Sequence, residues 1–127
     1  MMNKLKSVQP AEPEISLAYL KDIADGSQEF MVEMIDIFLH QTPAYLAELE
    51  KSIENKDWST VAEIAHKVRP TFTFIGVDQL TEIMASIEQK ARSGEDLSTI
   101  SKEFNEVKPL LRRVFEKLAE LRKELAQ

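Results

Sequence analysis

The sequence predicts an all-α fold: an antiparallel four-helix bundle with a short additional N-terminal helix. In every well-patterned segment the apolar residues recur with the helical period of about 3.6. No segment alternates polar and apolar residues for long enough to form a strand. The connections between the helical segments are short, so consecutive helices should pack as antiparallel neighbours. With 127 residues, the chain is long enough to bury one core.

Capping residues predict where the first two helices begin. Ser16 can cap a short helix over residues 16–24, which Asp25-Gly26 then stops, and Ser27 can open the second helix. The apolar period of the second helix continues across Pro43, which favours one kinked helix. The alternative, a new helix that starts with Pro43 in its first turn, also fits the sequence.

The remaining boundaries follow from the same signals. Asp57 can cap a third helix, and Gly76 can end it because glycine tolerates the left-handed conformation. Asp78 can cap a fourth helix, which closes at Ser93-Gly94, and Ser98 starts the last one.

The last helix carries a regular apolar seam. Its members are spaced four and three residues apart: Ile100, Phe104, Val107, Leu111, Val114, Leu118, Leu121 and Leu125. This spacing is typical of helices that pack at shallow angles in a bundle. Pro109 interrupts the helix, but the register survives it, so we expect one kinked helix. The polar face also carries Leu110 and Phe115, which could support self-association, although we expect a monomer.

Composition narrows the function further. Residues 1–14 form a polar stretch with two prolines, which we interpret as a disordered lead-in to a bundle domain over residues 15–127. The net charge of −6 argues against nucleic-acid binding. The sequence has no cysteine, no secretory signal and no apolar run long enough to span a membrane. We therefore expect a soluble cytoplasmic protein that does not bind membranes.

One of the two histidines is a candidate for chemistry. His40 closes an apolar run, and we interpret it as a structural residue at or near the surface. On a helical wheel, His66 points about 140° away from the core direction, toward solvent. Compact and charged residues surround it: Ala62, Glu63, Lys67, Arg69, Pro70 and Thr73.

Pro70 breaks a local rule beside this histidine. A proline inside a helix removes the hydrogen bond to the carbonyl of His66, costs about 3 kcal/mol and disfavours the helical conformation at Arg69. Such a cost beside an exposed imidazole is typical of a functional site. The alternative is that Pro70 only bends the helix over the core.

The residues around His66 resemble a known motif. They read Ala65-His66-Lys67-Val68-Arg69-Pro70, followed by Gly76. This segment resembles the phosphoacceptor motif of histidine-containing phosphotransfer (HPt) domains, Ala-His-x-Leu-Lys-Gly with a second glycine ten residues after the histidine. Val68 and Arg69 are conservative replacements, whereas Pro70 stands where the family usually has glycine. The resemblance extends from about Ile15 to Leu121, through Phe38-Leu39, Pro43, Leu46, Leu49, Asp57-Trp58 and Ile87-Glu88.

The resemblance implies a phosphoryl carrier, not an enzyme. His66 would take a phosphoryl group on Nε2 from the aspartyl phosphate of a receiver domain and pass it to another receiver. A hybrid sensor kinase and response-regulator receivers would be the partners. Magnesium would come from the receiver, so we expect no metal or cofactor here.

The resemblance also assigns roles around the histidine. Arg69, and Lys67 as a second candidate, would stabilise the phosphoryl oxygens. Glu88 would accept a hydrogen bond from Nδ1–H of His66 and so orient the ring; the alternative is that it only pairs with Arg92. Receivers would dock on Ala62, Glu63, Pro70 and Thr73, together with exposed apolar residues of the first two helices.

Two other functions compete with this one. A helical adaptor, or a degenerate HPt domain in which Pro70 has ended the chemistry, would bind receiver or kinase domains without phosphorylation. A di-metal enzyme is suggested by the Glu-x-x-His step at Glu63 and His66, but such a site needs a second step of this kind. The only other histidine, His40, has Ile37 three residues before it.

Overall fold

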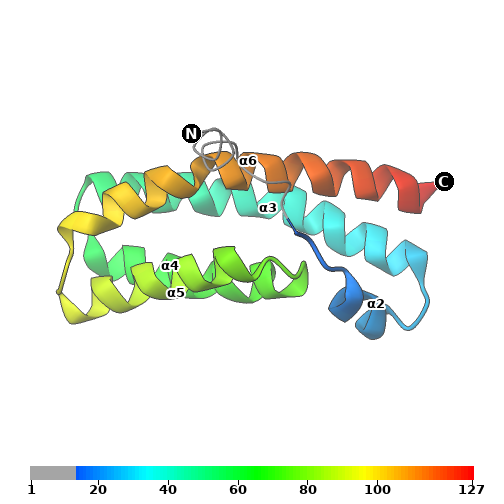
Figure 1. The fold of residues 1–127 in the computed structure, drawn as a ribbon, viewed down its shortest axis with the longest axis horizontal. Helices are drawn as coiled ribbons and strands as arrows, with labels where there is room; N and C mark the ends of the chain where they lie inside the picture. Colours follow the sequence, from blue (N-terminus) through cyan, green and yellow to red (C-terminus); the bar gives the residue numbers. More distant parts are fainter. Residues whose placement is uncertain (1–13) are drawn as a thin grey trace, which may run out of the picture.

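The computed structural model describes residues 14–127, and this part of the chain contains five helices and no strand (Figure 1). They are α2 (Ala18–Ala24), α3 (Gln28–Glu54), α4 (Trp58–Phe74), α5 (Asp78–Ser93) and α6 (Ser98–Ala126). The four long helices form the bundle, in which α4 packs mainly on α5 and α3 mainly on α6. The short α2 packs beside the first half of α3. The predicted all-α bundle with a short N-terminal helix is therefore confirmed.

The capping predictions hold for two helices and fail for two. The expected Ser16 cap is wrong, because α2 begins at Ala18 and its cap residue is Leu17, which makes no capping hydrogen bond. The Ser27 hydroxyl accepts a hydrogen bond from the Phe30 N–H at 3.1 Å, and the Asp57 carboxylate accepts one from the Thr60 N–H at 3.3 Å. The expected Asp78 cap is wrong, because Val77 is the cap residue and Asp78 is the first residue of α5. Its carboxylate lies in the first turn, where it interacts favourably with the positive end of the helix dipole.

The prolines lie inside continuous helices. Pro43 lies within α3 and Pro109 within α6, so a single helix is confirmed in both places. Pro70 lies within α4, and the helix continues through Arg69, which corrects the expectation that this residue leaves the helical region. Tertiary packing of the last turn, where Phe72 is fully buried, compensates for the missing hydrogen bond.

The core contains residues of all five helices. The first six residues of the predicted α6 seam are buried, and the last two are partly buried. Leu110 and Phe115 are half-buried against the core, and the Phe115 ring lies 5.5 Å from that of Phe38. Both residues thus contribute to the packing of the bundle, and their part in self-association stays a hypothesis.

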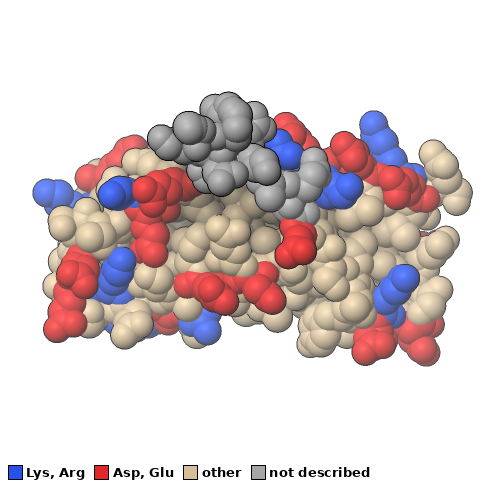
Figure 2. Space-filling model, viewed as in Figure 1, with Lys and Arg blue, Asp and Glu red and all other residues tan. Residues whose placement is uncertain are grey.

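The surface mixes both signs of charge. On the face shown in Figure 2, Lys and Arg side chains are scattered among acidic ones. Within residues 14–127, no helix is long and apolar enough to cross a membrane. The expected lead-in, residues 1–14, lies outside the described residues except for Glu14.

Two isoleucines of α3 provide a test of the core. Ile35 is 1% exposed and Ile37 is 47% exposed. We expect Ile35→Ala to lower the free energy of unfolding by about 2–5 kcal/mol, because it leaves a cavity in the core. Ile37→Ala is the matched control and should change it by less than about 1 kcal/mol. Urea denaturation measures both, and equal losses would contradict the described packing.

Candidate functional site

His66 lies in the middle of α4 with its imidazole in solvent. Its side chain is 66% exposed, while Ala65 and Val68 beside it are buried. The predicted exposure of His66 is confirmed. Because α4 is packed on both α3 and α5, its backbone holds the imidazole at a fixed place on the surface.

A carboxylate from α5 lies directly beside this imidazole. Nδ1 of His66 is 3.1 Å from Oε2 of Glu88, whose side chain is only 11% exposed. This distance agrees with the expected hydrogen bond from Nδ1–H, which would leave Nε2 as the free nitrogen. The site thus joins two helices that the packing holds together.

Two arginines bind the same carboxylate. Nη1 of Arg69 donates to Oε1 of Glu88 at 2.6 Å, and Nε of Arg92 donates to Oε2 at 2.9 Å. The pairing with Arg92, one turn away on α5, is the contact that sequence spacing suggested as an alternative, and it occurs together with the His66 contact. The pairing of Arg69 with Glu88 was not predicted, because the expected partners of Arg69 were an incoming phosphoryl group or Glu63 on its own helix.

These partners keep Glu88 ionised. Burial by itself would raise the pKa of this carboxyl group, but hydrogen bonds from Arg92, Arg69 and His66 oppose that effect. The net result is a pKa below the usual value of 4.5. A charged carboxylate therefore faces Nδ1 of His66 throughout the neutral pH range.

The surface on either side of His66 is hollowed. One depression, of about 310 Å³, lies toward the end of α4 and is lined by Tyr19, His66, Arg69, Pro70, Thr73, Phe74 and Thr81. A second, of about 450 Å³, lies toward the start of α4 and includes Glu63 and Lys67. Lys67 lies over the ring of Tyr45, with Nζ 5.2 Å from the ring centroid. The two candidate cations, Arg69 and Lys67, thus border different depressions.

Of the expected docking residues, three are exposed and one is not. Glu63, Pro70 and Thr73 are exposed on α4. Ala62 is only 2% exposed, so its expected place on a docking surface is corrected. The wheel assumed that α4 buries one narrow stripe, whereas α4 packs against both α3 and α5 and buries a wider arc.

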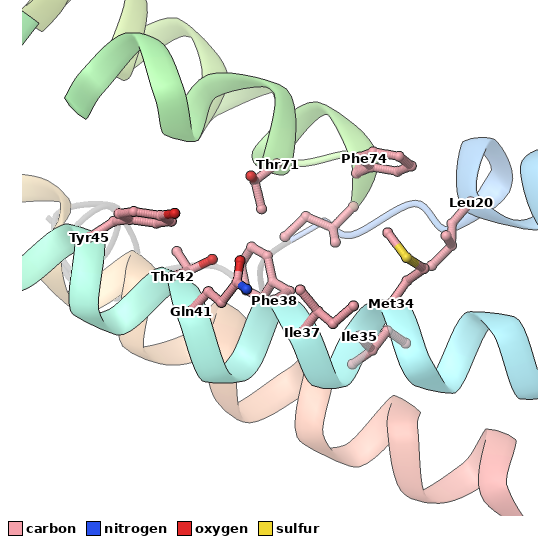
Figure 3. Close-up of a pocket in the computed structure, with 11 residues that line it drawn as sticks. Leu20, Met34, Ile35, Ile37, Phe38, Gln41, Thr42, Tyr45, Thr71 and Phe74 are labelled. Carbon is pink, nitrogen blue, oxygen red and sulfur yellow. The ribbon is translucent and has the colours of Figure 1, made fainter. Parts of the chain in front are cut away.

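Large apolar side chains are also exposed on the first two helices. They are Tyr19 and Ile23 on α2 and Ile37 on α3. An apolar groove of about 140 Å³ opens between α2, α3 and α4, and Leu20, Met34, Phe38 and Phe74 are among its lining residues (Figure 3). Phe74 also lines the depression beside His66, so the groove and the site adjoin. Tyr19 and Thr81 escaped sequence reasoning, because only the fold brings them near His66.

The structure also bears on the alternative of a di-metal site. Residues 14–127 contain no group of three or more His, Cys, Asp or Glu side chains that could hold a metal ion. The Glu63–His66 step therefore has no second set of metal ligands within this range. His40 is exposed on α3.

The sequence of the chain is similar to those of known proteins. A family model for the Hpt domain matches residues 33–127. The phosphorelay intermediate protein rdeA of Dictyostelium discoideum is 26% identical over 104 residues, which are 82% of this chain and 41% of that protein. The chain thus spans less than half the length of this relative. No solved structure matches the chain.

The charge of Glu88 should appear in the pH dependence of stability. Because the pKa of Glu88 is lower in the folded state, its contribution is complete above pH 4.5 and is lost as the pH falls through the folded-state value. Glu88→Gln cannot lose a charge, so its stability deficit relative to wild type should shrink between neutral pH and about pH 3. Urea denaturation at both pH values measures this. A deficit that is independent of pH would show that folding does not lower the pKa of Glu88.

Proposed function

The chain belongs to the Hpt domain family, and we propose that it carries a phosphoryl group on His66 within a phosphorelay. The observation that carries this proposal is an exposed imidazole whose Nδ1 is held by a buried carboxylate. The name of the rdeA relative, a phosphorelay intermediate, supports the same role. The receiver domains of response regulators and of a hybrid sensor kinase are the proposed partners.

The proposed transfer needs one nucleophile and no cofactor bound to this chain. The lone pair of Nε2 attacks the phosphorus of a receiver aspartyl phosphate, a P–N bond forms, and the O–P bond breaks. Its electron pair leaves with the aspartate carboxylate. The reverse step, on a second receiver, returns the imidazole to its starting state. His66 is thus a carrier that is regenerated with each cycle.

Glu88 orients the nucleophile in this proposal. By accepting from Nδ1–H, it selects the tautomer whose lone pair is on Nε2, and Nε2 then points away from α5. As the P–N bond forms, the ring gains positive charge, and the carboxylate 3.1 Å from Nδ1 stabilises that charge. No proton has to move during the step.

The two arginines neutralise charge in two ways. Arg69 and Arg92 compensate the buried charge of Glu88 in the resting state. Arg69 is 38% exposed on its side chain and borders the depression beside His66, so a phosphoryl group on Nε2 can compete for its guanidinium. Lys67 is a second cation, on the opposite side of His66.

A receiver would dock over the same face. Pro70 and Thr73 are compact and exposed, which permits close approach to His66. The exposed apolar residues Tyr19, Ile23 and Ile37 offer the apolar centre that a transient interface needs. Glu63 adds a charge at the edge.

His66→Gln tests the acceptor. We expect wild type to gain the mass of one phosphoryl group with acetyl phosphate and a receiver domain. This variant should not, because the amide has no nucleophilic nitrogen. Its fold should be intact, since the side chain is exposed. His40→Gln, the matched control, should be phosphorylated like wild type. Phosphorylation of His66→Gln would assign another acceptor, and a wild-type chain that gains no phosphoryl group would favour an adaptor.

Glu88→Ala tests the orienting role. Losing the Nδ1 contact should slow transfer from a phosphorylated receiver about tenfold, equivalent to about 1.4 kcal/mol of transition-state stabilisation. Glu88→Gln should retain much of the rate, because its amide oxygen can still accept from Nδ1–H. Rapid-quench measurements compare the three proteins. An unaltered rate in Glu88→Ala would reduce Glu88 to a structural ion-pair residue.

A further inference from the structure

The turn after α4 contains a glycine that is in close contact with the N-terminal segment. Gly76 has φ +69°, a left-handed conformation that favours glycine. A Cβ added there would lie 2.7 Å from Cβ and 2.9 Å from N of Ser16, and still closer to the Ser16 carbonyl oxygen. The Ser16 N–H donates to the Ile75 carbonyl at 3.1 Å. Because Gly76 has no side chain, the Ser16 backbone can pack directly against the end of α4. We call this contact the Ser16–Gly76 clasp.

The clasp is two residues from the start of α2. Leu20 and Ala24 bury the inner side of this helix, and its exposed side carries Tyr19 and Ile23. The Tyr19 ring lies 5.4 Å from that of Phe74, near the end of α4. Tyr19 also lines the depression that contains His66. A seven-residue helix has little stability of its own, so its position depends on contacts such as these.

We infer that Gly76 is a positioning residue for phosphotransfer: through the Ser16–Gly76 clasp it places α2, and with it Tyr19, at the edge of the His66 depression. The effect on phosphotransfer rests on the proposed function, whereas the placement of α2 does not depend on it. The family match begins at residue 33, so α2 lies before the matched region.

Gly76→Ala and Gly94→Ala form a matched pair. Gly94 also has positive φ, +77°, but a Cβ there would meet nothing within 4 Å. Both variants thus incur the backbone cost, and only Gly76→Ala disrupts the clasp. We expect faster amide hydrogen exchange at Ser16 and in α2 for Gly76→Ala, and wild-type exchange in α2 for Gly94→Ala. Equal exchange of α2 in the two variants would overturn the placement, whether or not the chain carries phosphoryl groups.

The consequence for function is measured with two phosphoryl donors. Transfer from a phosphorylated receiver domain should fall about tenfold in Gly76→Ala, the scale of losing one well-packed aromatic contact. Labelling of His66 by the small donor phosphoramidate should stay at the wild-type rate, because the imidazole is untouched. Tyr19→Ala should show the same split with the clasp intact. A loosened α2 with unchanged receiver transfer would overturn the positioning role. Loss of phosphoramidate labelling in wild type would instead count against the proposed function.

Ser16→Pro keeps the inference testable if Gly76→Ala does not fold. It removes the N–H that donates to Ile75 and leaves α4 and its turn unaltered. We expect the same faster exchange in α2 and the same loss of receiver transfer. Wild-type behaviour in both measurements would contradict the inference.

Discussion

The site depends on one buried carboxylate between two helices. Glu88 lies on the side of α5 that faces α4, where an unpaired charge would be strongly unfavourable. Its two oxygens contact Arg69 and His66 from α4 and Arg92 from α5. These contacts require one register between α4 and α5, since a shift by a turn would leave the charge without partners. The ion-pair cluster and the apolar packing therefore select the same arrangement of helices.

This arrangement explains how an exposed imidazole can still be oriented. The His66 side chain is 66% exposed. Such a side chain has few packing contacts that would restrict it to one rotamer. Here Nδ1 contacts the carboxylate of Glu88, which is buried between α4 and α5. The rest of the ring is exposed to solvent. Exposure and orientation are thus supplied by different elements. The same division applies to Arg69, which is bound by its tip to Glu88 but borders open surface.

The sequence predicted most of the fold because its signals are local. The caps at Ser27 and Asp57 depend on residues three positions away, and the α6 seam on a repeat within one helix. The errors that concern the site arose where two helices meet. Ala62 was misplaced because a wheel has no information about a second neighbour. The tertiary partner of Arg69 depends on the register of α5, which no spacing within α4 reveals, whereas Arg92 lies one turn from Glu88 on the same helix.

Pro70 shows why a broken local rule has to be judged in the folded molecule. Within an isolated helix it would disfavour the turn around Arg69, yet α4 continues to Phe74. The residues that hold this turn are apolar ones beyond the proline: Phe72 is fully buried, and Ile75 is 3% exposed. Because these anchors lie on the core side, the proline ring can remain on the solvent side, next to His66. The helix therefore tolerates a rigid, compact residue at the place where the proposed receiver would approach. The usual glycine would also be compact there, but it would leave the backbone freer.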